Sequence, residues 1–395
     1  MRIAIDGRTI EPRRSGVGQY AEYLVKSLLE IDDRNEYFLF LTVPNDSFRF
    51  PNCTPILIEG YSRMVLNRVW ENFLLPAQIR RYGIDLYFSP AFALPVLPRL
   101  SEAASLLPLP AGAQDLFNTR RRLHYTVTIH DVIGYLLPQY YTPKMRMWTH
   151  FFVPNAVALA DTIIAVSGTT KRDLASLFPA AEAKTEVIYP WFNETYRPVT
   201  DEELLAGIRK KYSLPGRFIL YLGTIEPRKN ITGLATAYAA LPASLQREVP
   251  LVIAGGGGWF TETIYSRIRN LETAGRISFI EYVPQEDLPA LYTLASVFGF
   301  PSLYEGFGSP PLEAMACGAP VIASDISAMP EVLGEAAVYV SPYSTKQIAG
   351  ALELLLTDGS LAGELRRRGI VQAGKYDRRK LAERTLEVLV KSAGR

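Results

Sequence analysis

The stretch that decides the fold is Phe300-Pro-Ser-Leu-Tyr-Glu-Gly-Phe-Gly-Ser-Pro-Pro-Leu-Glu-Ala-Met-Ala-Cys-Gly-Ala-Pro320. An apolar run that ends near Phe300 predicts a buried strand, and a glycine-bearing loop follows it. Pro310 or Pro311 suits the first turn of a helix, where a missing N–H costs least, and Gly318 suits the position just past its end. The stretch therefore predicts a strand, a loop and a short helix in succession, as in a parallel α/β sheet.

Short apolar runs and longer helix-compatible segments alternate along the rest of the chain, which is typical of a parallel sheet covered by helices. The runs that predict strands are 2–6, 37–42, 54–58, 86–89, 125–130, 162–166 and 185–188 in the first half, and 218–222, 250–254, 277–279, 297–300, 321–323 and 337–340 in the second. The segments that predict helices include 18–31, 64–82, 144–160, 169–177, 230–240, 311–317, 345–357 and a tail from about 378 to 392. The alternation runs through twice, so the expected class is α/β with two Rossmann-like halves.

The length of 395 residues also favours two domains, at about 100–200 residues per domain. We expect the boundary within 193–215, which contains Pro198, several charges and the turn-like Ser213-Leu-Pro-Gly216. The expected parts are an N-terminal Rossmann-like domain, a second such domain and a C-terminal helix, over residues 1–195, 196–377 and 378–395.

Composition narrows the class of protein. The chain has 42 Lys and Arg against 40 Asp and Glu, a net charge of +2, which argues against a nucleic-acid binder driven by bulk charge. Cys53 and Cys317 are the only cysteines, which gives no disulfide framework and no Cys-rich zinc site and fits a reducing compartment. No cleavable signal and no run of ~18–20 apolar residues is present. We therefore expect a cytoplasmic or peripheral protein.

The loop and helix of the opening stretch predict an anion site. Backbone N–H groups at 309–312 would point out of a helix N-terminus, where unpaired donors and the helix dipole favour phosphate. Glu305 in the loop and Glu313 in the first turn could accept hydrogen bonds from sugar hydroxyls on either side of a diphosphate. In a plainer interpretation, which stays open, Glu313 stabilises the helix dipole and Glu305 is solvated.

A second motif is Leu222-Gly-Thr-Ile-Glu-Pro-Arg-Lys-Asn230. It begins at the carboxyl end of a predicted strand, where open α/β sheets bind ligands. Arg228 and Lys229 are natural partners of a diphosphate, and Gly223 would let a ligand approach the backbone closely. The alternative is a charged turn in which Asn230 caps the next helix.

The first half contributes two weaker signals. Gly16 and Gly18, just before the helix predicted to follow the first strand, allow close approach of an anion, but the spacing lacks a dinucleotide fingerprint and counts against a dehydrogenase. His130 ends a predicted strand beside Asp131, which makes it a site candidate, although a lone histidine is often structural. No serine-hydrolase elbow, HExxH or Walker loop accompanies it.

Together these motifs resemble the retaining glycosyltransferases of family 4, whose two Rossmann-like domains face each other across a cleft in the architecture called GT-B. Glu305 and Glu313 match the family's Glu-x7-Glu motif. The segments Gly-Thr-Ile-Glu-Pro-Arg-Lys-Asn, Ser-Gly-Val-Gly-Gln-Tyr and Thr-Ile-His-Asp-Val are similar to those of bacterial mannosyltransferases that build surface polysaccharides such as lipopolysaccharide O-antigen. The resemblance covers the whole chain and outweighs the plainer interpretations; it implies a C-terminal helix that packs back on the first domain.

The resemblance implies a role for each candidate residue. A nucleotide-diphosphate sugar would bind mostly to the second domain, with its diphosphate on Arg228 and Lys229 and its ribose hydroxyls on Glu313. Glu305 would take hydroxyls of the donor sugar, and His130 would approach the transferred sugar. The remaining implied donor contacts are Gly308, Ser309 and Leu312 at the helix start, Tyr282 and Val283 near the base, Gly223 where the ligand approaches the backbone, and Gly16 and Gly18 from the first domain.

The resemblance also implies the chemistry. Relatives retain the anomeric configuration, and the usual proposal is front-face attack in which the leaving phosphate accepts the acceptor's proton. Neither a metal nor another cofactor is expected, because the Asp-x-Asp ligation of the other common transferase fold is absent. GDP-mannose is the expected donor; a UDP- or dTDP-sugar, or a non-catalytic sugar-nucleotide-binding partner in a polysaccharide assembly complex, is the alternative.

The acceptor is expected on the first domain and is a saccharide or a polyprenyl-diphosphate-linked oligosaccharide. Two basic, partly apolar stretches, 62–81 and 95–122, could touch an anionic membrane, which would place the protein at the inner face of the cytoplasmic membrane. The plainer interpretation of 62–81 is a helix that covers the sheet.

Overall fold

The computed structural model describes residues 1–11, 16–58, 75–91, 94, 123–191, 194–271 and 276–394. The chain divides into two compact units: unit 1 is Met1–Trp191 with Asp377–Arg395, and unit 2 is Phe192–Tyr376. The domain limits expected from the sequence, at 195/196 and 377/378, lie within a few residues of these divisions.

The described residues of unit 1 form a seven-stranded parallel sheet of order β3-β2-β1-β4-β5-β6-β7. Every strand expected from the sequence in this half is present, with ends shifted by at most one residue. The strands are β1 (Arg2–Asp6), β2 (Glu36–Leu41), β3 (Cys53–Leu57), β4 (Leu86–Ser89), β5 (His124–Ile129), β6 (Thr162–Ala165) and β7 (Thr185–Val187). The helices are α1 (Gly16–Ile31), α3 (Leu75–Tyr82), α6 (Ile133–Leu136), α7 (Pro143–Leu159), α8 (Gly168–Leu177) and α18 (Arg378–Ala393).

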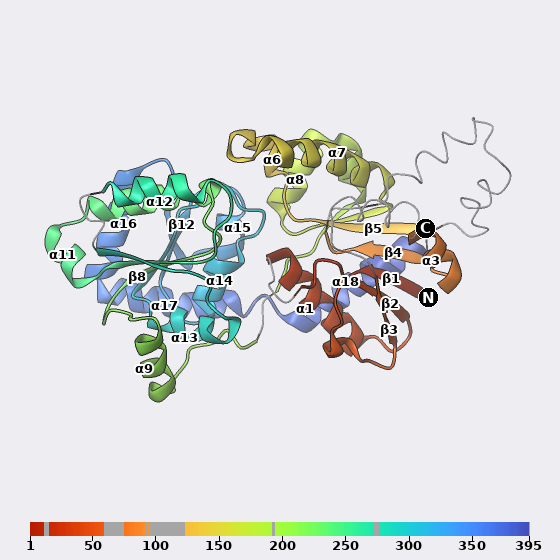
Figure 1. Cartoon of the computed structure of the whole chain (residues 1–395), viewed down its shortest axis with the longest axis horizontal. Helices are drawn as coiled ribbons and strands as arrows, with labels where there is room; N and C mark the ends of the chain where they lie inside the picture. The colour runs from red at the N-terminus through yellow and green to blue at the C-terminus, as the bar shows by residue number, and fades with distance from the viewer. Residues whose placement is uncertain are drawn as a thin grey trace. The chain divides into compact units, whose positions relative to one another are not determined.

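Two hydrophobic cores cover the two faces of this sheet. Because side chains alternate along a strand, β1 sends Ile3 and Ile5 to one core and Ala4 to the other. The first core packs against α1 and α18, and the second against α3, α7 and α8. Figure 1 shows this division, with α1 and α18 on one side of the strands and α7 and α8 on the other. Helices on both faces make the sheet a doubly wound one.

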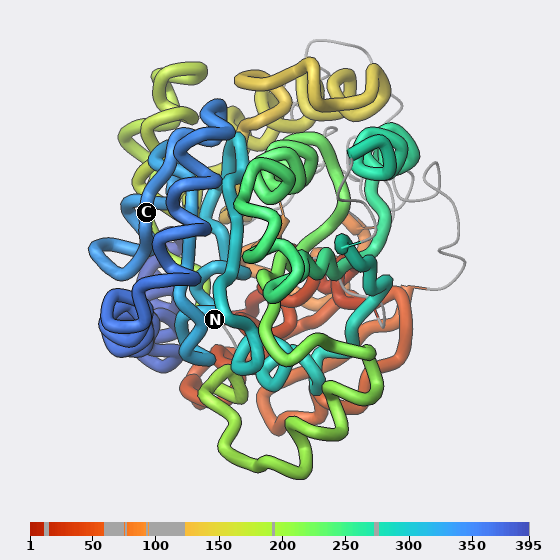
Figure 2. Tube along the Cα trace, turned by 90° about the vertical axis from the view of Figure 1, so that its left-hand side faces the viewer, coloured from red at the N-terminus to blue at the C-terminus, as the bar shows by residue number. Residues whose placement is uncertain are grey.

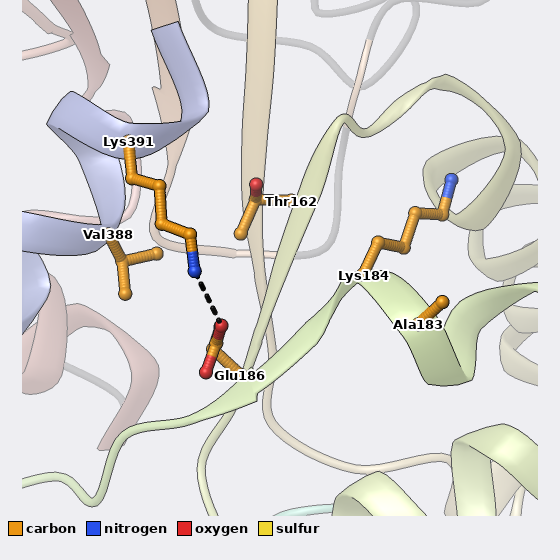
Figure 3. A pocket seen from close by; sticks show the side chains of 6 residues that line it. All are labelled: Thr162, Ala183, Lys184, Glu186, Val388 and Lys391. Carbon is orange, nitrogen blue, oxygen red and sulfur yellow. Dashed lines mark ion pairs between the residues drawn. The ribbon is translucent and has the colours of Figure 1, made fainter. Parts of the chain in front are cut away.

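Helix α18 follows unit 2 in the chain and yet packs in unit 1, as the resemblance implied. Asp377 caps it by accepting a hydrogen bond from the Lys380 backbone N–H at 2.8 Å. Glu186 on β7 forms ion pairs with Arg384 at 3.4 Å and with Lys391 at 3.7 Å. Figure 3 shows the second ion pair beside a small pocket lined by Thr162, Ala183, Lys184, Glu186, Val388 and Lys391. The end of the chain therefore completes the first unit.

The described residues of unit 2 form a six-stranded parallel sheet of order β10-β9-β8-β11-β12-β13. All strands expected here are present, again within one residue: β8 (Ile219–Leu222), β9 (Leu251–Ala254), β10 (Ile277–Ile280), β11 (Val297–Phe300), β12 (Val321–Ser324) and β13 (Ala337–Val340). The helices are α9 (Glu202–Lys211), α10 (Ile231–Ala239), α11 (Ala243–Glu248), α12 (Thr261–Arg269), α13 (Leu288–Leu294), α14 (Ser309–Ala316), α15 (Met329–Leu333), α16 (Thr345–Thr357) and α17 (Gly359–Ala373). Figure 2 shows helical turns on both sides of the strands.

Some helices differ from the expectation. The segment 193–215, in which the domain boundary was expected, contains α9, which Asp201 caps through the backbone N–H groups of Glu203 and Leu204. Helices α6, α11, α12, α13, α15 and α17 were also not expected. Of the predicted helix 64–82, residues 75–82 are helical, and 64–74 lie outside the described residues.

Helix α18 offers a matched pair for testing its place in unit 1. Leu389 is fully buried in the first core, whereas its neighbour Val390 is 47% exposed. We expect Leu389→Ala to lower the free energy of unfolding of unit 1 by about 2–5 kcal/mol, because it removes buried methyl groups and leaves a cavity. Val390→Ala should stay within about 0.5 kcal/mol of the unchanged protein. Urea denaturation measures both, and equal losses for the two variants would contradict the packing of α18 described here.

Candidate active site

The strand order of unit 2 brings two distant loops together. The order reverses between β8 and β11, and ligands of open α/β sheets bind outside the carboxyl ends of the strands at such a point. The loops after β8 and β11 are joined there by a 2.7 Å hydrogen bond from the Leu303 N–H to the Arg228 carbonyl. Asn230 donates through its side-chain amide to the Pro301 carbonyl at 3.0 Å. The two motifs found in the sequence thus form one site.

A buried cluster of charges occupies this point. Lys229 Nζ lies 2.6 Å from Glu305 Oε1, and Arg228 Nη1 lies 2.9 Å from Glu305 Oε2. The Ser302 hydroxyl donates to Glu305 Oε1 at 2.7 Å. Glu305 is only 5% exposed, so the interpretation that it is solvated is wrong. Its partners in this structure are the cations that the sequence assigned to a diphosphate.

The pKa values in the cluster follow from burial and charge. Burial raises the pKa of Glu305, but the charges of Arg228 and Lys229 outweigh it and lower the pKa to about 2. Burial, together with the charge of Arg228, lowers the pKa of Lys229. The carboxylate is therefore ionised throughout the neutral range.

Glu226 is a member of the cluster that the sequence analysis missed. It is 2% exposed, and its Oε1 lies 2.6 Å from Arg228 Nε, an ion pair whose angles fall outside those of a hydrogen bond. Arg228 is therefore paired with Glu226 through Nε and with Glu305 through Nη1. Its place two residues before Arg228 in the same motif was the available signal.

Helix α14 begins as expected but with fewer donors. Gly308 precedes it at φ +90°, a conformation that favours glycine because it strains other residues, and a Cβ at this position would also lie 2.1 Å from Met329 Cε. Pro310 and Pro311 lie in the first turn and have no N–H. Of the four positions expected to donate, only Ser309 and Leu312 carry a backbone donor, which corrects the prediction.

Glu313 lies one turn deeper than expected. It is the fifth residue of α14, so its predicted place in the first turn is wrong, and it is 7% exposed. The Tyr292 hydroxyl donates to Glu313 Oε2 at 3.0 Å, and the Tyr196 hydroxyl is a second partner. Burial raises the pKa of Glu313 to about 7, although both hydroxyls act to lower it. The interpretation in which Glu313 only stabilises a helix dipole leaves these two partners unexplained.

The other predicted residues of unit 2 lie in the loops after the strands. Gly223 follows β8 at φ +154°, and a Cβ there would lie 3.1 Å from the Tyr221 hydroxyl. After β10, Tyr282 is 61% exposed and Val283 is buried. Gly255 was not predicted: a Cβ there would lie 2.0 Å from the Gly223 carbonyl oxygen, and the run Gly255-Gly-Gly-Gly258 was its signal.

In unit 1, His130 follows β5 at the carboxyl edge of the sheet. Its Nε2 lies 2.8 Å from the Pro90 carbonyl oxygen. Because a carbonyl only accepts, we assign the proton to Nε2, which leaves a lone pair on Nδ1 of the neutral ring. Burial lowers the pKa of His130, and the Tyr20 ring of α1 packs edge-on at 4.9 Å. The neutral ring is thus available as a hydrogen-bond acceptor.

Gly16 and Gly18 are the first and third residues of α1, so they lie within the helix rather than before it as expected. A side chain at Gly16 would meet no atom within 4 Å, whereas Gly18 is buried. A buried ion pair at the end of β1 was also not predicted: Arg8 Nη2 lies 2.6 Å from Asp6 Oδ2. Its signal was Asp6-Gly-Arg8 at the end of the first strand.

In the part of the chain that the structure describes, no group of three or more His, Cys, Asp or Glu side chains could hold a metal ion. None of the described helices combines the length and hydropathy needed to span a lipid bilayer.

The assignment of His130 leads to a pH prediction. Since burial lowers its pKa below the usual value of about 6.5, the ring stays neutral as the pH falls through 6.5 and gains its proton only at lower pH. Nitrogen NMR of protein labelled in its three histidines measures this, and His130→Gln identifies the resonance. A His130 ring that is half-protonated at or above pH 6.5 would contradict the assignment.

Each half of the chain matches a family of known proteins. Residues 14–196 match the family Glycosyltransferase Family 4, and residues 208–375 match Glycosyl transferases group 1. O-antigen chain mannosyltransferase B of Escherichia coli is 30% identical over 399 residues, which cover 95% of this chain and 96% of that protein. The serotype-specific mannosyltransferase WbdA of E. coli is 35% identical over 257 residues, 62% of this chain but only 31% of that protein.

Solved structures agree on the fold. The crystal structure of Anabaena HepE in complex with UDP and glucose has a TM-score of 0.72 and 16% sequence identity, and the match covers 99% of this chain and 100% of that one. With its two parallel-sheet units and its full-length similarity to a mannosyltransferase, the chain belongs to the glycosyltransferases of family 4 and has the GT-B fold.

Proposed function

We propose that the protein transfers mannose from GDP-mannose to a saccharide or lipid-linked saccharide acceptor, with retention at the anomeric carbon and without a metal ion. One observation carries the proposal: Arg228 and Lys229 are held together at the strand reversal of unit 2, in a chain similar over its full length to an O-antigen mannosyltransferase. A buried lysine and a partly buried arginine at this edge are suited to a diphosphate.

The donor would bind along unit 2. Its diphosphate would contact Arg228 and Lys229, with further donors from the backbone of Ser309 and Leu312 at the start of α14. Gly223 leaves room beside this path, and Tyr282 and Val283 would line the base. Glu313 would accept the ribose hydroxyls.

Glu305 would change partners when the donor arrives. Without a donor it accepts hydrogen bonds from both cations. A diphosphate competes for those cations, and the hydroxyls of the transferred sugar offer the carboxylate new donors. An unpaired buried charge is the main cost of opening such a cluster, and this exchange would leave none.

The chemistry would depend on positioning and charge. The bond between the anomeric carbon and the phosphate oxygen breaks as the acceptor oxygen attacks from the same face, and the leaving phosphate takes the acceptor's proton. Arg228 and Lys229 would stabilise the negative charge that develops on this phosphate. His130, with Nδ1 as its acceptor, would hold a hydroxyl of the transferred sugar and help to stabilise charge at the anomeric carbon.

The acceptor would bind to unit 1, with peripheral contact to an anionic membrane. Residues 95–122 and most of 62–81 lie outside the described residues. Within 62–81, Arg80 and Arg81 lie in the last turn of α3. Co-sedimentation with anionic liposomes measures the contact, and equal recovery in the supernatant with and without lipid would count against it.

Nucleotide binding and transfer test the proposed donor. If GDP-mannose is the donor, GDP should raise the unfolding temperature more than UDP, ADP or dTDP does. A ligand at a hundred times its Kd stabilises the folded protein by about 2.7 kcal/mol, which such a measurement detects. Mannose transfer from GDP-mannose should persist in EDTA. A larger shift with UDP or dTDP would replace the donor, and loss of transfer that Mg²⁺ or Mn²⁺ restores would overturn the metal-free mechanism. A shift without transfer from any sugar nucleotide would favour the non-catalytic partner, and no shift with any nucleotide would contradict both.

Lys229→Ala tests the role given to the cations. We expect kcat/KM for transfer to fall by about 100-fold or more, because the variant lacks a charge that stabilises the leaving phosphate. Lys210→Ala, at an exposed position of α9, is the matched control and should keep the activity of the unchanged protein. Circular dichroism checks that both variants fold. Transfer by a folded Lys229→Ala variant within about twofold of the control would remove Lys229 from the mechanism.

A further inference from the structure

Glu313 is surrounded by hydroxyl donors and by no cation that acts on it within the described residues. The titratable groups that influence it are Tyr292 on α13, Tyr196 in the segment before α9, and Cys317 at the end of α14. Glu305, by contrast, has two positive partners. The two glutamates of the motif therefore lie in opposite electrostatic environments.

The two tyrosines are held firmly in place. Tyr292 is fully buried and Tyr196 is 5% exposed. The Tyr292 ring packs against Tyr196, with ring centroids 6.1 Å apart, and edge-on against Phe298 on β11, with centroids 5.5 Å apart. Burial raises the pKa of Tyr292 well above its usual value, so its hydroxyl keeps its proton and remains a donor.

The number of hydrogen-bond acceptor sites on Glu313 limits how many ligand hydroxyls it can bind. An ionised carboxylate has two oxygens and about four acceptor sites. Tyr292 and Tyr196 use two of these sites. The two that remain match the two hydroxyls of a ribose cis-diol, whereas a 2′-deoxyribose offers only one.

We propose that Tyr196 and Tyr292 are positioning residues that hold Glu313 as an oriented carboxylate, so that the site selects ribonucleotide over 2′-deoxyribonucleotide donors. The inference rests on the proposed function, in which Glu313 accepts the ribose hydroxyls. The hydroxyls act in two ways: they fix the plane of the carboxylate, and they offset part of the burial that favours its protonated form. The pair therefore disfavours dTDP-sugars among the alternative donors.

Ionisation of Glu313 gives the inference a pH signature. Its pKa, raised to about 7, means that the group is an acceptor at both oxygens above neutral pH and carries a proton below it. Preference for the ribonucleotide should therefore grow as the pH rises through 7. Removing either tyrosine hydroxyl should move the midpoint to higher pH, since each hydroxyl acts to lower the pKa.

The test compares binding of GDP and 2′-deoxy-GDP between pH 5.5 and 9 by calorimetry, with the protein unchanged and as Tyr292→Phe, Tyr196→Phe and Tyr238→Phe. Tyr238 is the matched control: it is fully buried in the same unit, and its hydroxyl donates to the Gln246 carbonyl at 2.9 Å. We expect the unchanged protein and the control to prefer GDP by about tenfold at pH 8, the worth of one hydrogen bond to a charged group. In Tyr292→Phe and Tyr196→Phe the preference should fall at pH 7 and return at higher pH.

The outcomes separate this inference from the function on which it rests. Unaltered preference and midpoint in the folded tyrosine variants would overturn the positioning role, even if GDP binds tightly. Equal binding of GDP and 2′-deoxy-GDP at every pH by the unchanged protein would overturn the ribose selection while leaving the transferase proposal standing. If no nucleoside diphosphate binds, the proposed function itself fails. If Tyr292→Phe does not fold, Tyr196→Phe alone tests the positioning role.

Discussion

The parallel pairing of β8 with β11 is the constraint on which the site of unit 2 depends. It aligns the carboxyl ends of two strands that are distant in the chain, so that Lys229 and Glu305, 76 residues apart, meet at 2.6 Å. Neither charge could stay buried alone, because removing an isolated ion from water costs several kcal/mol. The pairing and the ion pair therefore support each other: the sheet places the charges, and the charges hold the loops.

The cluster of two carboxylates and two cations is close to neutral, and this affects how an anion can bind. Glu226 and Glu305 already balance Arg228 and Lys229. An anion attracted to this point must draw on the donors at the start of α14 and on the rearrangement of Glu305, rather than on an open positive charge. The arrangement keeps the cations aligned before any ligand binds, which is the form of preorganisation that positions charge for a transition state.

The strands and the outlines of the site could be predicted from sequence because they depend on local patterns. Apolar runs predict every described strand to within a residue, and Pro310 and Pro311 predict the first turn of α14. Partners could not be predicted in the same way. Tyr196 and Tyr292 reach Glu313 from separate elements, and Glu305 turned out to be paired rather than solvated, because such contacts depend on tertiary packing. Helix α9 was missed although Asp201 and the basic residues at its end are ordinary helix signals; nearby Pro198 and Ser213-Leu-Pro-Gly216 favoured a loop.

The return of α18 to unit 1 has a consequence for the order of synthesis. Unit 2 lies between the two parts of unit 1 in the chain, so a ribosome completes unit 2 before it has made the helix that covers one face of the first sheet. At about 5–20 residues per second, the wait is on the order of ten seconds or more. Throughout that time the side chains that Leu389 and Val388 later cover remain open to water. The second unit to be started is therefore the first that the growing chain can finish.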